Sequence, residues 1–208
     1  MSMTLNPVNE AAFQKAVQSL ETLNRAAVFH PTGTGKSCIA WKVVEAHPQT
    51  TFFWLVAGAQ RLALRQAELT RYNGGTLPGN VRFCDCEKLA AATPEQWVRL
   101  GEQKPGCIVL DCYHELSAVC WAQSVQKLLR MCPQAKVLGL GVPNGAPVCA
   151  AAQELFADCI VSHMTVAEAM AAGTMPVPSA YAALLWPQEE ELATLRARIK
   201  NLCMPKGD

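Results

Sequence analysis

Residues 31–37 read Pro-Thr-Gly-Thr-Gly-Lys-Ser and offer the groups that hold the phosphates of a nucleoside triphosphate. Gly33 and Gly35 allow backbone N–H groups to turn inward around phosphate oxygens. Lys36 supplies a positive charge toward the β and γ phosphates, and the Ser37 hydroxyl is a ligand for Mg²⁺. Loops of this kind usually begin with glycine, whereas this chain has His30 at that position. The simpler alternative is a glycine turn that only joins a strand to a helix.

The residues on either side predict the two elements that such a loop needs. Residues 26–29 are a short apolar run that predicts a buried strand, and residues 37–46 have apolar side chains at helical spacing. A helix that starts at the loop adds the positive end of its dipole to the phosphate site. A random glycine turn rarely places Gly-Lys-Ser at the start of a helix directly after a buried strand. We therefore favour the nucleotide site over the simple turn.

A second acidic motif follows another predicted strand. Residues 107–110 are Cys-Ile-Val-Leu, and Asp111 comes directly after them. In a parallel sheet, ligands bind at the carboxyl ends of the strands, so this carboxylate is expected near the phosphates, where it would hold Mg²⁺ through water. The alternative is an aspartate that caps the next segment. The sequence thus predicts ATP as ligand, with Mg²⁺ held by Ser37 and Asp111.

The remaining pattern predicts an α/β fold, because strands alternate with helices of ten or so residues. Such alternation indicates a mainly parallel sheet with helices on both faces, a three-layer αβα arrangement. We expect this domain to span residues 1–178, and residues 179–208 to form a linker and an amphipathic C-terminal helix over 188–202. Further helices are predicted over 9–23, 60–71 and 118–131 and from 93–95 onward, and further strands over 51–56, 81–86, 136–140 and 158–162.

Composition narrows the class of protein. The chain has 208 residues, of which half are apolar and 17% charged, and its net charge is +1. The chain therefore lacks the excess of Lys and Arg expected of a protein that binds nucleic acid without a partner. The ten cysteines are scattered without zinc spacing, and alternation places Cys84 and Cys86 on the same face of a strand. With no signal-peptide core and no run of transmembrane length, we expect a reduced, soluble, cytoplasmic protein.

Together the motifs resemble superfamily 2 helicases of the DEAD/DEAH type, most closely the restriction-enzyme-like helicases. His-Pro-Thr-Gly-Thr-Gly-Lys-Ser is followed about 75 residues later by Val-Leu-Asp-Cys-Tyr-His. The resemblance covers nearly the whole chain and implies a RecA-like P-loop NTPase fold, that of the first motor domain. It implies catalytic roles for Asp111 and for His114, which would link the nucleotide site to the third helicase motif. It implies that adenine is read by Gln14 and that ATP is contacted by Pro31, Thr32, Gly33, Thr34, Gly35, Lys36 and Ser37.

The departures from that family concern catalysis. Cys112 stands where the family has the glutamate that orients the attacking water, and general-base help of this kind contributes about 10² to 10⁴ in rate. A cysteine sulfur is only a weak acceptor. The third motif reads Gly-Val-Pro-Asn over 141–144, without the family's hydroxyls. The arginine finger, which the resemblance assigns to a second motor domain, is not expected in this sequence.

Three hypotheses follow. The leading one is a degenerate, ATP-binding, helicase-like domain with weak or absent ATPase activity and no unwinding by itself. The second is an active, nucleic-acid-dependent ATPase or helicase half, completed by a second RecA-like domain in another chain or by a homo-oligomer. The third is an interaction module that no longer binds nucleotide. The expected partners are ATP or ADP and, weakly, DNA or RNA, with no membrane.

Overall fold

A computed structural model describes residues 3–111, 119–143, 155–156, 158–177, 193–194 and 196–197. The chain divides into two compact units, Met1–Pro176 and Val177–Asp208. Most of the predicted C-terminal helix over 188–202 lies outside the described residues, and the four that are described there are helical. The predicted domain boundary after residue 178 stays a prediction.

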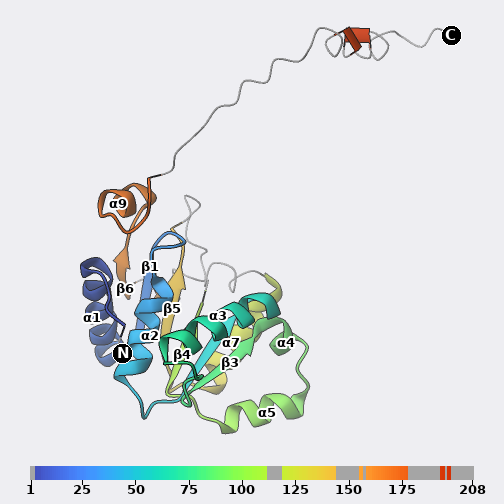
Figure 1. The fold of residues 1–208 in the computed structure, drawn as a ribbon. Coiled ribbons are helices and arrows are strands. Elements are labelled where there is room, and N and C mark those ends of the chain that lie inside the picture. Colours follow the sequence, from blue (N-terminus) through green and yellow to red (C-terminus); the bar gives the residue numbers. More distant parts are fainter. Residues whose placement is uncertain are drawn as a thin grey trace, which may run out of the picture. The chain divides into compact units, whose positions relative to one another are not determined.

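The first unit is built on a sheet of six parallel strands (Figure 1). Their order across the sheet is β3-β2-β4-β5-β1-β6, so β5 lies between the strand before the phosphate loop and the strand before Asp111. All of these connections are parallel crossovers, which confirms the predicted α/β class. The strands are β1 (Arg25–Phe29), β2 (Phe52–Val56), β3 (Val81–Asp85), β4 (Cys107–Leu110), β5 (Lys136–Gly141) and β6 (Ile160–His163).

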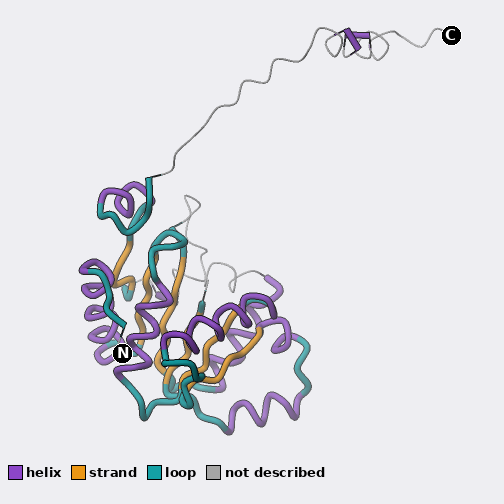
Figure 2. Tube along the Cα trace, in the orientation of Figure 1, coloured by secondary structure: helices purple, strands orange, loops and turns teal. Residues whose placement is uncertain are grey.

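Helices cover both faces of the sheet (Figure 2). On one face lie α1 (Pro7–Thr22), α2 (Lys36–Ala46) and α3 (Ala59–Tyr72), and on the other lie α4 (Cys86–Ala90), α5 (Pro94–Glu102) and α7 (Val119–Met131). A short helix, α9 (Val166–Ala171), follows β6. The predicted three-layer αβα arrangement is therefore confirmed. Among the described residues, no helix is both long and apolar enough to cross a membrane.

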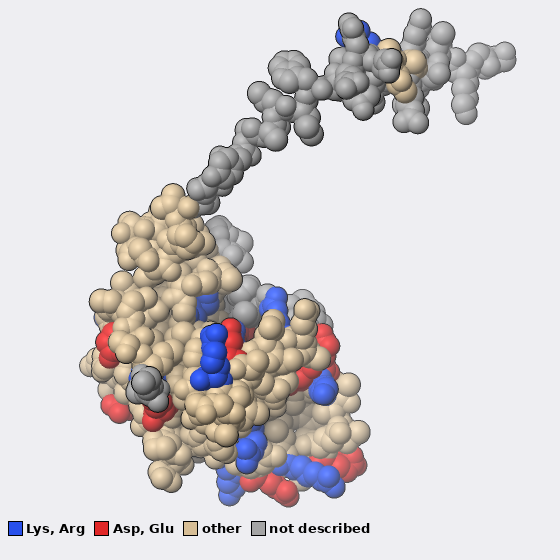
Figure 3. All heavy atoms as spheres, viewed as in Figure 1, with Lys and Arg blue, Asp and Glu red and all other residues tan. Residues whose placement is uncertain are grey.

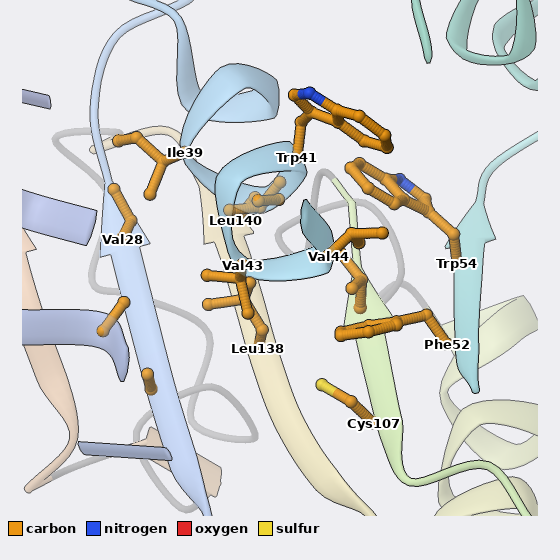
Figure 4. Packing of buried hydrophobic residues seen from close by; sticks show 14 of the residues in the cluster. Val28, Ile39, Trp41, Val43, Val44, Phe52, Trp54, Cys107, Leu138 and Leu140 are labelled. Atoms are coloured by element: carbon orange, nitrogen blue, oxygen red, sulfur yellow. The ribbon is translucent and has the colours of Figure 1, made fainter. Parts of the chain in front are cut away.

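The core beneath α2 fixes the helix that carries the phosphate loop. Figure 4 shows Ile39, Val43 and Val44 of α2 pointing at the sheet, where Val28 and Leu138 meet them. All five residues are at most 1% exposed. Burying an aliphatic side chain of this size contributes about 1.5–3 kcal/mol, so the first turn of α2 is held firmly against β1.

Short local signals explain where the structure agrees with the sequence and where it differs. Thr93 caps α5 and accepts from Gln96 in a capping box, as its position before Pro94 predicts. The predicted strand over 81–86 was one residue too long, because the Asp85 side chain accepts the Glu87 N–H at 3.0 Å and starts α4 at Cys86. Cys84 and Cys86 are therefore not on one strand, although both are buried in the same core.

Helices α4 and α9 were not predicted, since five or six residues show no clear periodicity.

Candidate phosphate-binding site

The loop between β1 and α2 has the backbone that its two glycines predict. Gly33 has φ +86° and Gly35 has φ +91°, a backbone conformation that residues with a side chain rarely adopt. At Gly35 an added Cβ would also lie 2.8 Å from Asn9 Nδ2, whereas at Gly33 it would meet nothing within 4 Å. Conformation alone requires glycine at 33, and conformation and space together require it at 35.

Side chains brace the loop from behind. Thr34 Oγ1 donates to the Pro31 carbonyl at 2.8 Å. Asn9 of α1 donates from Nδ2 to the Thr34 carbonyl, also at 2.8 Å, and both Asn9 and Thr34 are 3% exposed. Sequence reasoning missed Asn9. The available signal was its spacing, because Asn9 shares the buried face of α1 with Ala12 and Ala16.

Lys36 and His30 tie the two ends of the loop together. Lys36 Nζ donates to the carbonyls of His30 and Pro31 at 2.8 Å each, which holds the ammonium over the loop. His30 is fully buried, and its Nε2 lies 2.7 Å from Ser162 Oγ on β6. Burial, then the charges of Lys36 and His163, lower the pKa of His30 to about 4. The residue at the unusual first position is thus a neutral imidazole at pH 7 that links the loop to the edge strand.

A cleft of about 620 Å³ opens beside this loop, between the start of α2 and α3. Asp111 lies in its wall, since β1 and β4 end at the same edge of the sheet. The structure therefore brings the phosphate loop and the predicted acidic residue together. The cleft is lined by Thr32, Gly33, Gly35, Lys36, Ser37, Cys38, Val56, Ala57, Arg61, Leu64, Arg65, Glu68, Tyr72, Asp111 and Val142.

Asp111 is bound from two sides by other parts of the chain. Its Oδ2 accepts from Arg65 Nε of α3 at 2.6 Å and from Trp54 Nε1 of β2 at 3.1 Å, and Asp111 is 3% exposed. Arg65 also pairs with Glu68 one turn further along α3. Burial by itself would lower the pKa of Arg65, but Asp111 and Glu68 together raise it above its usual value. These contacts occupy Oδ2 of the carboxylate that the sequence motif predicts to hold Mg²⁺ through water, and that role of Asp111 stays a prediction.

Other predicted residues lie elsewhere or are not described. Gln14 is exposed on α1, where its Nε2 donates to Glu10 Oε1 at 2.9 Å, and it does not line the cleft. Cys112 and His114 lie outside the described residues. Within the described ranges, no group of three or more His, Cys, Asp or Glu side chains is arranged to hold a metal ion.

The altered third motif has a steric explanation at its first residue. A Cβ added at Gly141 would overlap the ring of Phe29, which is 2% exposed on the neighbouring β1. Serine or threonine at 141 is therefore incompatible with phenylalanine at 29 unless the ring moves. Val142 follows and lines the cleft with an apolar surface instead. Asn144 lies outside the described residues.

The charges of the cleft favour an anion. Among the described residues that line it, three are basic (Lys36, Arg61 and Arg65) and two are acidic (Glu68 and Asp111), a formal charge of +1. On the face shown in Figure 3, basic and acidic side chains are interspersed in small groups and form no broad basic surface.

A parallel sheet with β5 between the loop strand and the aspartate strand, and a glycine loop closed around Lys36, defines a RecA-like P-loop fold. Two solved structures have a similar fold. The chain is similar to the ATP-dependent Type ISP restriction-modification enzyme LlaBIII bound to DNA, with a TM-score of 0.58 and 13% identity over 83% of this chain and 16% of that one. It is also similar to a hypothetical ATP-dependent RNA helicase from Sulfolobus tokodaii, with a TM-score of 0.55 and 9% identity over 74% of this chain and 52% of that one.

At these identities the likeness shows the fold alone, which is a RecA-like three-layer αβα fold. The chain spans only 16% and 52% of the lengths of these two proteins. No protein-family model and no curated protein sequence matches the chain.

Proposed function

We propose that the chain is an ATP-binding, helicase-like domain with weak or absent ATPase activity and no unwinding by itself. The observation that carries this proposal is the loop over 31–37, with both glycines at positive φ and Lys36 held over it, open to a cleft of about 620 Å³. A P-loop uses these elements for phosphates: inward backbone N–H groups, a lysine and a helix N-terminus. The formal charge of +1 on the described lining residues supports an anionic ligand.

The low turnover rests on the residues that would handle the attacking water. By resemblance Cys112 takes the place of the catalytic glutamate, which removes a factor of about 10² to 10⁴. An arginine finger is worth about 10³ to 10⁵, and the resemblance assigns it to a second motor domain. Both losses together leave hydrolysis close to background.

Nucleic acid is proposed only as a weak partner of the isolated chain. The net charge is +1, and phosphate backbones are held by clustered Lys and Arg. A second RecA-like domain in another chain, or a second copy of this one, would supply both the missing arginine and the opposite wall of the cleft. The adenine-reading role of Gln14 stays a prediction.

An interaction module without nucleotide is the second candidate, and the pairing of Arg65 with Asp111 favours it. In that case, the ion pair would have a structural role, holding α3 against the end of β4 at the position where the resemblance implies a catalytic site. Thermal unfolding separates the two, since a ligand that binds only the folded state stabilises it by about 2.7 kcal/mol at a hundred times its Kd. Millimolar ATP or ADP raises the Tm of a nucleotide-binding domain and leaves that of the module unchanged.

Single-turnover hydrolysis tests the catalytic part. The wild type should bind ATP and hydrolyse it near the uncatalysed rate, and Cys112→Glu should raise the rate by about 10² to 10⁴ if the rest of the site is well formed. Cys38→Glu, a substitution at a cysteine of the same cleft, is the matched control and should give no gain. Wild-type turnover comparable to that of an intact motor would overturn the proposal of a degenerate site.

A further inference from the structure

Every acidic side chain that lines the cleft within the described residues is engaged by one arginine. These side chains are Asp111 and Glu68, and Arg65 donates to both, from Nε to Asp111 and from its terminal nitrogen to Glu68. Mg²⁺ takes oxygen ligands at about 2.0–2.1 Å in octahedral geometry and binds proteins through one or two carboxylates. Arg65 therefore occupies one oxygen of each carboxylate that would serve such an ion.

The arginine is held in this position from several directions. The Asp111 side chain is 4% exposed and the Arg65 side chain 20%, so the pair is largely shielded from water. Trp54 donates to the same carboxylate oxygen at 3.1 Å and keeps it turned toward α3. The two acidic partners raise the pKa of Arg65 above its usual value, so the charge is permanent. A fixed cation therefore stands beside the phosphate loop.

The charge balance makes this arrangement consequential for a ligand. A bare carboxylate next to a triphosphate repels it, and in most P-loop sites a divalent cation offsets both charges. Here Arg65 itself neutralises Asp111, and the described lining residues carry a formal charge of +1 without any metal. Arg61, in the first turn of α3, adds a second guanidinium to the same wall.

We propose that this site takes a nucleoside di- or triphosphate without a divalent cation, with Arg65 neutralising Asp111 in the place of Mg²⁺. The inference rests on the proposed function, because it presupposes that nucleotide binds at the loop. It replaces the predicted role of Asp111 as a magnesium ligand. The site would accept ADP and ATP in metal-free form.

Isothermal titration calorimetry with ATP, once with excess Mg²⁺ and once with excess EDTA, tests this inference. The wild type should show dissociation constants that differ by less than about threefold between the two conditions, equivalent to about 0.65 kcal/mol. Lys36→Ala should lose binding in both. Binding by the wild type that needs Mg²⁺ while Lys36→Ala binds nothing would overturn this inference and leave the proposed function intact. If the wild type binds no ATP under either condition, both this inference and the proposed function are wrong.

Variants of Arg65 provide a second test of this inference. Arg65→Gln removes the cation, so binding in EDTA should weaken about tenfold and Mg²⁺ should recover it, because a hydrogen-bonded charge contributes about 1.4 kcal/mol or more. Arg65→Lys keeps the charge and should retain metal-free binding. Arg82→Gln, an exposed arginine on β3 outside the cleft, is the matched control and should behave as the wild type. Equal affinities of Arg65→Gln with and without Mg²⁺ would contradict the role of Arg65 even if its fold, checked by circular dichroism, is intact.

Discussion

Arg65 Nε lies 2.6 Å from Asp111 Oδ2, and this ion pair joins α3 to the end of β4 at the edge of the sheet where the phosphate loop opens. The pair connects residues 46 positions apart in the sequence. Breaking a buried pair by removing one partner costs about 3–5 kcal/mol, because the other charge is left uncompensated. The contact thus contributes to stability as well as to the charge of the cleft.

Trp54→Phe should destabilise the protein more than Trp41→Phe, by about 2 kcal/mol, since a hydrogen bond to a charged group contributes about 1.5–3 kcal/mol. Both rings are buried, and the two substitutions remove the same atoms (Figure 4). Only Trp54 donates to Asp111, whereas Trp41 Nε1 has no hydrogen-bond partner among the described residues. Urea unfolding of both variants measures the difference. If Trp54→Phe and Trp41→Phe have equal free energies of unfolding, the hydrogen bond from Trp54 to Asp111 contributes nothing to stability.

Stability should fall as the pH drops from 6.5 to 4, because of His30. Its pKa is 6.5 in the unfolded chain and is lowered to about 4 in the folded protein, first by burial and then by Lys36 and His163. Between these values the unfolded state binds more protons, so acid favours unfolding by about 3 kcal/mol in total. Urea unfolding at several pH values, in wild type and His30→Asn, should show a flatter profile for the variant. Parallel profiles would refute this account of His30.

Gly141→Ala should destabilise the protein by about 1–3 kcal/mol, because the new methyl group overlaps the Phe29 ring. Phe29→Leu makes room, so the double variant should lose less than the sum of the two single losses. Gly79→Ala, where an added Cβ meets nothing within 4 Å, is the control and should have little effect. Thermal denaturation of the wild type, the two single variants and the double variant measures the coupling. Additive losses would mean that the ring does not exclude a side chain at 141.

Asn9→Ala should weaken ATP binding about fivefold, since a hydrogen bond worth about 1 kcal/mol then no longer braces the loop at Thr34. Gln14→Ala changes an exposed side chain of the same helix and should leave the loop intact. If Gln14 reads adenine, this second variant loses its preference for ATP over GTP. Competition titrations with both nucleotides distinguish the two effects, and an unchanged ATP affinity in Asn9→Ala would contradict the bracing role.

The sequence predicted the elements that local patterns encode. The strand, glycine loop and helix over 26–46 were recognisable because their signals are contiguous, and Thr93-Pro94 marked the start of α5 for the same reason. The apolar run before Asp111 similarly identified β4 and placed this residue at the sheet edge. These predictions needed no knowledge of how α3 packs.

The contacts that redefine the site are tertiary and could not be predicted in this way. Arg65 and Trp54 reach Asp111 across 46 and 57 positions, and their meeting depends on the register of α3 and β2 against β4. The clash between Gly141 and Phe29 depends on the pairing of β5 with β1. A carboxylate after a strand indicates a ligand position, but only the packing reveals which cation it receives.

Equilibrium dialysis with labelled ATP tests the central claim most directly, using wild type, Lys36→Ala and Lys42→Ala. Lys42 lies on the same helix and pairs with Glu45 outside the cleft, so its loss changes the net charge equally without touching the loop. Wild type and Lys42→Ala should bind one ATP each with the same affinity, whereas Lys36→Ala should not bind ATP. Equal binding by all three proteins, or by none, would contradict a phosphate site at this loop.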